Sequence, residues 1–171
     1  MRVLFFLKRL ALVSIGLSAI LMLKAQALDQ VVPQVDTSAL PAQAKTWQEP
    51  NPLRGNAQAA AIGQQAFSQS CARCHGENAN GTRAPAPDLR RLGGRCQRIQ
   101  DDALRQRCMG DADAFFIKSV RYGKQKFGME HMPPWEGVIS PELGWALRSY
   151  VETAPKGTGI ESLAPSAKAA Q

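Results

Sequence analysis

Histidine and long hydrophobic runs are scarce in this 171-residue sequence. Its two histidines leave little of the acid–base equipment that enzymes draw on most often. The clearest apolar run, residues 10–23, would form a helix of only about 21 Å, against a membrane hydrocarbon core of about 30 Å. Aromatic residues make up 6% of the chain, and no internal repeat is visible. An uncleaved membrane anchor is therefore the weaker interpretation of this run.

The N-terminus has the pattern of a cleaved export signal. Arg2, Lys8 and Arg9 precede the apolar run, and the small-x-small sequence 25–27 follows it. We expect residues 1–27 to be a signal peptide that is removed, so that the mature protein enters the periplasm of a Gram-negative bacterium. Removal lowers the formal charge from +7 to +3, because the segment holds four basic residues and no acidic ones. This balance gives no support for nucleic-acid binding, and we expect no stable membrane insertion after cleavage.

Cysteine is also sparse, and two of the four cysteines lie in one pentapeptide. Residues 71–75 read Cys-Ala-Arg-Cys-His, the attachment signature of c-type haem. Cys71 and Cys74 can form thioethers with the porphyrin, while His75 ligates the iron. A zinc site or a redox dithiol is the alternative, and a zinc site would have to recruit His131 with Cys96 or Cys108.

The opposite face of a haem iron needs a second axial ligand. Met132 is the strongest candidate, because the following Pro133 favours extended backbone and holds the side chain out from a pinned loop. His131 and Met129 are the alternatives. A metal-bound imidazole usually donates its other N–H to an acceptor, and we expect the Pro87 carbonyl to accept it from His75.

The other cysteines, Cys96 and Cys108, lie outside this motif. In an oxidising compartment a disulfide is the natural prediction, with free thiols as the alternative. Six arginines between positions 90 and 107 surround the pair. They form either a solvated face with partners for the haem propionates or a docking patch for an acidic protein.

Helical periodicity begins at Asn56, a predicted N-cap. We expect a helix over 57–67 with Ala60, Gly63, Ala66 and Phe67 on one face. A short helix capped by Asp101 should cover 101–107. Another helix should start at Asp111 or Asp113 and end near Tyr122. A loop should cover 123–139. Ser140 should cap a closing helix whose apolar face carries Leu143, Trp145, Ala146, Leu147, Tyr150 and Val151. Before these elements, residues 28–55 should form an extended proline-rich arm that docks through Trp47; disorder is the alternative. A flexible tail over 155–171 should follow.

From 56 to about 153 these motifs resemble class I cytochromes c: the haem pentapeptide, Pro87-Asp88-Leu89, Met132-Pro133 and the closing helix with Leu147 and Tyr150. The resemblance implies an all-α class I cytochrome c fold over 56–154 with one covalent haem c. It also implies that the first and last helices cross near Gly63, with Phe67, Leu147 and Tyr150 at the crossing. The resemblance further implies that His75 and Met132 ligate the haem iron. It implies one-electron transfer rather than enzyme activity.

A narrower resemblance covers nearly the whole mature length. The run 47–56, the Cys96 and Cys108 insertion and Met132-Pro133-Pro134-Trp135 look like the exported cytochromes c (c-550 type) that serve PQQ-dependent alcohol dehydrogenases, ethanol dehydrogenase above all. This implies a monomeric carrier that takes electrons from the dehydrogenase and passes them to a terminal oxidase or another cytochrome. A methanol dehydrogenase or other periplasmic oxidoreductase is an alternative donor. A haem enzyme or ligand sensor with a labile sixth ligand, or a subunit that stays docked to its partner, is the alternative function.

Overall fold

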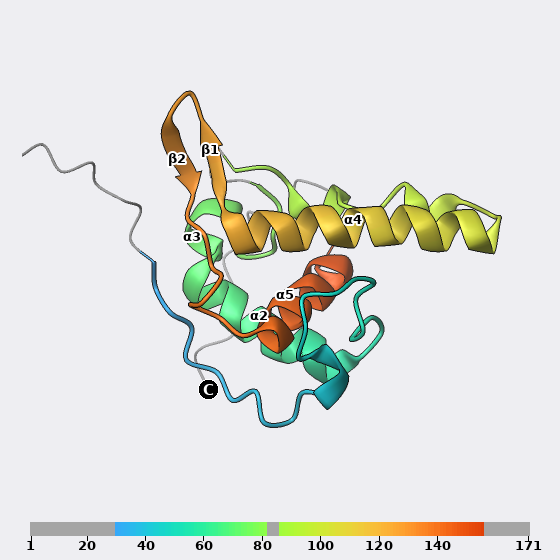
Figure 1. Cartoon of the computed structure of the whole chain (residues 1–171), viewed down its shortest axis with the longest axis horizontal. Helices are drawn as coiled ribbons and strands as arrows, with labels where there is room; N and C mark the ends of the chain where they lie inside the picture. Colours follow the sequence, from blue (N-terminus) through green and yellow to red (C-terminus); the bar gives the residue numbers. More distant parts are fainter. Residues whose placement is uncertain (1–29, 82–85, 156–171) are drawn as a thin grey trace, which may run out of the picture.

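The computed structural model describes residues 30–81 and 86–155, and the predicted signal peptide lies outside them, as does the tail after Pro155 (Figure 1). The main helices are α2 (Ala57–Ser70), α3 (Ala72–His75), α4 (Asp102–Tyr122) and α5 (Pro141–Thr153). Short 3-10 turns cover Ala42–Ala44 (η1), Leu89–Arg91 (η2) and Cys96–Arg98 (η3), and two strands, β1 (Lys124–Lys126) and β2 (Met129–Met132), form a hairpin. The structure is therefore rich in helix, with one small sheet.

The crossing of α2 and α5 lies at the centre of the molecule. Asn56 and Ser140 cap the two helices, as predicted, by accepting from the backbone N–H groups of Ala59 and Leu143. A Cβ on Gly63 would lie 2.0 Å from the carbonyl oxygen of Ala146, so the helices meet where no side chain fits. The predicted crossing near Gly63 is confirmed.

The apolar faces of these helices agree with the expected periodicity in α5 and differ slightly in α2. All six apolar residues expected on the α5 face are buried. In α2 the buried face is Ala59, Ile62, Gly63, Ala66 and Phe67, so the prediction that Ala60 belongs to it is wrong. The first buried residue of the helix is Ala59 rather than the predicted Ala60, because Ala59, Ile62 and Ala66 follow one another at helical spacings of three and four.

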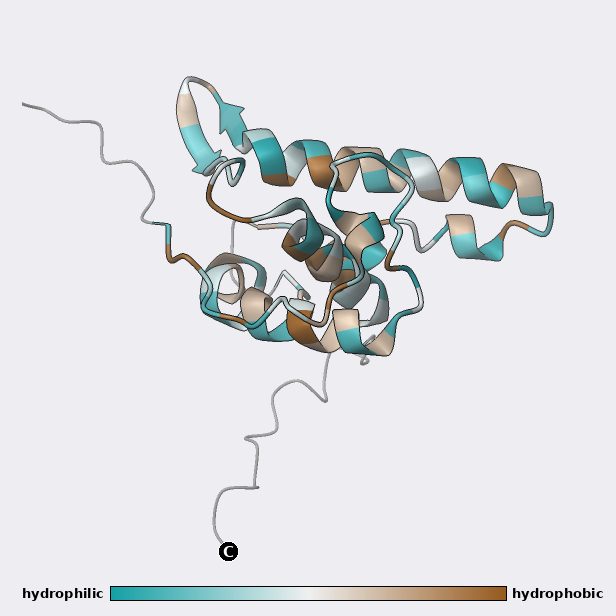
Figure 2. Ribbon diagram, turned by 60° about the horizontal axis from the view of Figure 1, so that its bottom comes forward, coloured by the Kyte–Doolittle hydropathy of each residue, from teal (hydrophilic) through white to brown (hydrophobic). Residues whose placement is uncertain are grey.

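One continuous helix, α4, replaces the two helices predicted between 101 and 122. Asp101 caps it through the N–H of Leu104, as expected, but neither Asp111 nor Asp113 begins a new helix. Gly110 has open space around it and does not interrupt the helix. Figure 2 shows hydrophobic and hydrophilic segments alternating along this long ribbon, as expected for a helix with one buried face.

Asp113 has a structural role instead. Its buried carboxylate accepts a hydrogen bond from Arg148 Nε at 2.8 Å, from Arg54 Nη2 at 2.7 Å and from the Asn51 backbone N–H at 2.9 Å. Arg54 also pairs with Glu152 at 2.8 Å. These contacts join the arm, α4 and α5 around one buried acid.

The segment predicted as a loop over 123–139 contains the β1–β2 hairpin. This corrects the loop prediction and adds one small hairpin to the helix-rich fold. Phe127 and Gly128 form the two-residue turn with φ values of 53° and 74°, the left-handed geometry that tight hairpins use. A phenylalanine at such a position is an unusual turn residue, so the sequence gives a weak hairpin signal here.

The arm from residue 30 onward lies against the helices, with the η1 turn within it. Trp47 contacts α5 at Gly144, where a Cβ would lie 2.3 Å from the indole, and Trp145 Nε1 donates to the Thr46 carbonyl at 2.7 Å. No helix in the described ranges is long and apolar enough to cross a membrane.

The predicted disulfide is present. It joins Cys96 in η3 to Cys108 in the first half of α4, twelve positions along the chain. It therefore fastens the inserted segment to the end of α4 that lies away from the hairpin (Figure 1).

Candidate haem site

The haem motif forms its own short helix directly after α2. The Cys71 N–H donates to the Phe67 carbonyl at 2.8 Å, and the His75 N–H donates to the Cys71 carbonyl at 3.0 Å. One turn, α3, therefore presents Cys71, Cys74 and His75 from a rigid base. Both cysteines are free thiols in the structure, and Cys71 is half-buried while Cys74 is exposed.

Burial raises the pKa of the Cys71 thiol to about 12, and the neighbouring Cys74 adds a smaller effect in the same direction. A thiol in this state is protonated at neutral pH, and only the thiolate is a good metal ligand or redox nucleophile. Cys71 is thus a poor redox nucleophile.

His75 is oriented by the loop that follows the motif. Its Nδ1 lies 3.3 Å from the Pro87 carbonyl oxygen, the acceptor expected from the sequence. A carbonyl can only accept, so Nδ1 carries the proton and Nε2 keeps a free lone pair. Burial lowers the pKa of His75, and the contact with Pro87 partly offsets this. The neutral imidazole that an iron ligand requires is therefore favoured.

The loop geometry that brings Pro87 to His75 depends on a glycine. The Gly81 N–H donates to the His75 carbonyl at 2.8 Å, and its φ is +67°. A Cβ there would lie 2.5 Å from the Asp88 nitrogen. Tyr150 fixes the same loop by donating from its hydroxyl to the Glu77 carbonyl at 2.8 Å.

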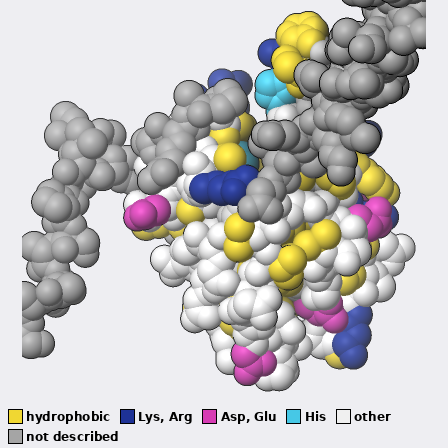
Figure 3. All heavy atoms as spheres, turned by 90° about the vertical axis from the view of Figure 1, so that its left-hand side faces the viewer, with side chains coloured by type: hydrophobic (Ala, Val, Ile, Leu, Met, Phe, Trp, Pro, Cys, Tyr) yellow, Lys and Arg dark blue, Asp and Glu magenta, His cyan; other side chains and the backbone are white. Residues whose placement is uncertain are grey.

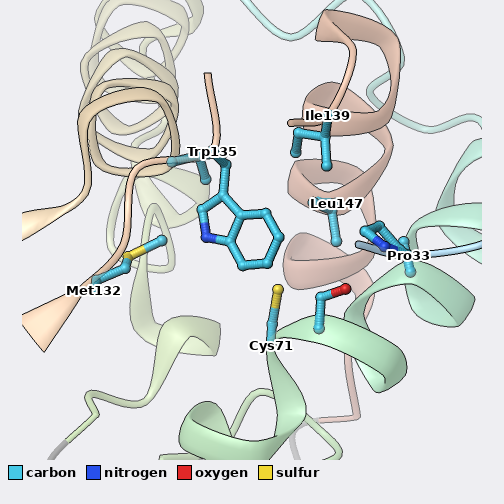
Figure 4. A pocket seen from close by; sticks show the side chains of 9 residues that line it. Pro33, Cys71, Met132, Trp135, Ile139 and Leu147 are labelled. Atoms are coloured by element: carbon cyan, nitrogen blue, oxygen red, sulfur yellow. The ribbon is translucent and has the colours of Figure 1, made fainter. Parts of the chain in front are cut away.

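A small, mainly apolar pocket lies beside Cys71 (Figure 4). Figure 4 shows the Trp135 indole between Met132 and Leu147, close to the Cys71 sulfur. The pocket is lined by Pro33, Ala66, Ser70, Cys71, Val120, Met132, Trp135, Ile139 and Leu147. The structure thus brings Cys71 and Met132 to one cavity, while His75 lies outside its lining.

Of the three candidate axial ligands in β2 and its surroundings, only Met132 faces this pocket. Along β2, Met129 and His131 are exposed, whereas Glu130 and Met132 are half-buried, as the alternation of a strand requires. Gly123 lets the Met132 backbone pass close to the end of α4, since a Cβ there would lie 2.3 Å from the Met132 carbonyl oxygen. The geometry favours Met132 over Met129 and His131.

A zinc site finds no support in the described ranges. No three His, Cys, Asp or Glu residues gather there as a metal site would need, and the disulfide removes Cys96 and Cys108 as ligands. By contrast, two unpaired thiols on one helical turn, an oriented neutral imidazole and an apolar cavity with a thioether on its wall fit a covalently attached haem.

Sequence reasoning missed several contributors to the pocket, among them Pro33 and Val120. Pro33 lies in the arm, which shows no periodicity, so nothing in its surroundings marks it as buried. Val120 is an ordinary apolar position of α4, and only the packing of that helix brings it to the cavity.

The comparisons with known proteins agree with this site. Residues 58–151 match the family described as cytochrome c oxidase, cbb3-type, subunit III, a range that includes the haem motif and Met132. The chain belongs to the cytochrome c family, whose domain implies covalently bound haem c and electron transfer. Its helix-rich structure is consistent with a cytochrome c fold.

One similar cytochrome matches most of the chain. Cytochrome c550 of Pseudomonas aeruginosa strain PAO1 is 35% identical over 149 residues, which cover 84% of this chain and 90% of the relative. No solved structure gives a significant match.

Proposed function

We propose that this protein is a periplasmic one-electron carrier with a class I cytochrome c fold. In this proposal it accepts electrons from a PQQ-dependent alcohol dehydrogenase, ethanol dehydrogenase foremost, and passes them to a terminal oxidase or another cytochrome. The observation that carries the proposal is that Met132 and Cys71 line the same apolar pocket, while Pro87 orients the imidazole of His75 in the helical turn that follows Cys71.

Each residue of the site has a defined task in this proposal. Cys71 and Cys74 would hold the haem through thioethers, and His75 and Met132 would ligate its iron. The haem supplies a one-electron ferric–ferrous couple. Pro87 keeps His75 in a single tautomer by accepting a hydrogen bond from its Nδ1–H. The soft sulfur of Met132 favours the ferrous state and so raises the reduction potential.

The pocket lining supports a carrier more than an enzyme. Val120, Trp135, Ile139 and Leu147 line the pocket together with Met132, so a ligand sulfur there would face hydrocarbon and indole rather than open water. Strong ligands on both faces leave no position for a substrate. His131, the other histidine of the chain, is exposed and faces away from the pocket, so no histidine stands ready as a distal acid–base group.

The donor assignment rests on the sequence resemblance over the arm, the disulfide-closed insertion and the segment 132–135. Stopped-flow reduction of the oxidised, haem-loaded protein by purified quinoprotein ethanol and methanol dehydrogenases tests it directly. We expect faster reduction by the ethanol enzyme. If the two enzymes reduce the protein equally fast, or not at all, the ethanol dehydrogenase assignment is wrong, but the assignment as a cytochrome stands. Gel filtration of the isolated protein would distinguish a free monomer from a subunit that stays docked to its partner.

The ligand assignment has a matched pair of variants. Met132→Ala should lose the thioether-to-iron charge-transfer band and bind carbon monoxide rapidly when reduced. Met129→Ala, three positions earlier in β2 and 60% exposed, should keep both properties of the wild type. Rapid and complete carbon monoxide binding by the wild type would instead support a ligand sensor or haem enzyme.

A further inference from the structure

The tip of the β1–β2 hairpin carries an aromatic residue, Phe127, whose solvent exposure and backbone conformation are both unfavourable. The Phe127 ring is 86% exposed, and its φ of 53° lies in the region that bulky residues rarely adopt. Asparagine or glycine would fit the turn better and expose less apolar surface. Unfavourable backbone geometry and unfavourable exposure thus coincide at one residue, a combination that points to function.

The outer face of α4 continues this surface. Phe115, Lys118 and Tyr122 are spaced three and four residues apart, so they share one face of the helix, and all three are exposed. Lys124 in β1 places its Nζ 4.5 Å from the centre of the Phe115 ring, which joins the hairpin to the helix. The hairpin and the end of α4 therefore present one surface.

We call this the aromatic–lysine surface. It consists of Phe115, Lys118, Tyr122, Lys124, Lys126, Phe127 and Met129. Lys126 lies 5.3 Å from the Phe127 ring, and its pairing partner across the hairpin is Met129, so the two side chains share one side of the sheet. In Figure 3 hydrophobic and basic side chains lie together at the top of the view, where the hairpin projects.

The charge of the surface is basic. Lys118, Lys124 and Lys126 are all exposed. Near the hairpin, Glu136 is paired with Arg121, and Glu130 is half-buried on the opposite side of β2 from Met129. Asp111 is exposed one turn before Phe115, so the basic part of the surface is its hairpin end. An apolar centre with cationic surroundings is complementary to an acidic protein surface that contains an apolar recess.

The position of the surface suggests what kind of protein would use it. The hairpin runs directly into Met132, and the backbone of Met132 lies against Gly123 at the base of β1. A protein docked on the hairpin would therefore sit beside the pocket proposed to hold the haem. Electron transfer needs such proximity, whereas membrane attachment has no need of it.

We propose that the aromatic–lysine surface docks an acidic redox partner protein, with Phe127 as its hydrophobic anchor. This inference rests on the proposed function and adds the location and chemistry of the interface. The lysines steer the encounter, so their effect weakens with salt, while Phe127 holds the complex through burial and its effect persists.

The central variant is Phe127→Asn, because Asn-Gly is a preferred hairpin turn and the fold should be kept. Its control is Leu104→Asn, which alters another exposed apolar residue, 48% exposed, near the start of α4. Reduction of the haem-loaded proteins by quinoprotein ethanol dehydrogenase and oxidation by oxidase-containing membranes of the source cells are both measured. We expect Phe127→Asn to slow at least one reaction about tenfold. Leu104→Asn should leave both unchanged.

A second pair tests the charge. Lys126→Gln should slow the same reaction at low salt and converge with the wild type at high salt, whereas Lys45→Gln, on the arm, should do neither. Reduction by ascorbate should be equal in all variants, and an unchanged thermal midpoint should show that Phe127→Asn is folded.

The possible outcomes separate the two proposals. If the dehydrogenase fails to reduce the wild type but Phe127→Asn still slows oxidation, the donor assignment is wrong and the surface is right. Wild-type rates for Phe127→Asn in both reactions overturn the docking surface. The docking surface is also overturned if the wild type sediments with phosphatidylglycerol vesicles, Phe127→Asn does not, and the two proteins have equal electron-transfer rates. A wild type that reacts with neither preparation overturns both proposals.

Discussion

Arg148 and Asp113 form an ion pair that water does not reach, with both side chains 0% exposed. Arg148 also lies over the Phe116 ring at 5.7 Å, while its Nη1 and Nη2 make no hydrogen bond. Nη2 is within 3.1 Å of Glu152 Oε1, a charge contact without hydrogen-bond geometry. The arginine therefore depends on Asp113 for its one well-formed hydrogen bond, and without Asp113 only the contact with Glu152 would balance its buried charge.

The first prediction follows from this dependence. Asp113→Asn should lower the free energy of unfolding by about 3–5 kcal/mol, because it removes the fully buried counter-charge of Arg148 and weakens the contact of Arg54. Guanidinium denaturation of the haem-loaded protein measures the change. Glu152→Gln is the control and should cost less, since Glu152 lies at the edge of the cluster with its side chain 8% exposed. Equal losses in the two variants would contradict the special role of Asp113.

A second residue-scale prediction concerns Tyr150. Its hydroxyl donates to the Glu77 carbonyl, and its ring lies 5.2 Å from that of Phe67. Burial, with a smaller contribution from Glu77, raises the pKa of Tyr150 above its usual value. The folded protein therefore favours the neutral phenol. The resulting stability is complete below the unfolded pKa of about 10 and declines as the pH rises through the folded pKa.

Tyr150→Phe should thus lower the free energy of unfolding by about 1 kcal/mol at neutral pH through loss of the hydrogen bond. The difference between wild type and variant should shrink above about pH 10, where the wild-type phenol begins to ionise on unfolding. Denaturation curves at several pH values measure this. A difference that grows with pH would show that the hydroxyl is not held in its neutral form.

At the scale of elements, the crossing of α2 and α5 gives the sharpest pair of variants. Gly63→Ala would place a methyl group 2.0 Å from the Ala146 carbonyl oxygen, so the helices must separate. We expect a loss of about 1–3 kcal/mol or more by thermal denaturation. Gly110→Ala in α4 meets nothing within 4 Å and should stabilise the protein by about 0.5–1 kcal/mol. A neutral Gly63→Ala would mean that the crossing can relax without cost.

The start of the arm forms another element with a consequence for the pocket. Ser70 Oγ donates to the Val31 carbonyl at 2.7 Å, and the Gln34 N–H donates to Gln69 Oε1 at 2.7 Å. Gln30 donates to the Pro134 carbonyl. The segment 30–34 therefore bridges the end of α2 and the loop after Met132, and it inserts Pro33 into the pocket between them.

Opening this bridge should expose the axial position. Pro33→Gly should lower the reduction potential, because water entering the pocket stabilises the ferric state, and should make carbon monoxide binding to the reduced protein severalfold faster. Redox titration and flash photolysis measure the two effects. Pro52→Gly, at an exposed proline of the same arm, should change neither. If both variants behave alike, the bridge has no part in shielding the site.

At the scale of the whole molecule, the sequence predicted what local chemistry determines. Asn56 and Ser140 as caps, Cys96 with Cys108, and Pro87 beside His75 all follow from residue type and spacing. Prediction from the sequence failed for the features that tertiary packing determines. Asp113 looks like a helix cap in isolation, and only its contacts with Arg148 and Arg54 explain a buried acid within α4. The hairpin turn at Phe127 carries no usual turn residue, and Pro33 has no periodic context.

The molecule also separates its two pairs of cysteines in space. The helix rise puts Cys108 about 18 Å along α4 from Val120, which lines the pocket. The disulfide should therefore contribute to stability without tuning the site. Replacing Cys96 and Cys108 together by alanine should lower the free energy of unfolding by about 3 kcal/mol, the loop-entropy value for this separation. The absorption spectrum and reduction potential of the haem-loaded protein should not change. A shift in either would mean that the inserted segment reaches the iron through α4, and the molecule would then have to be treated as one coupled unit.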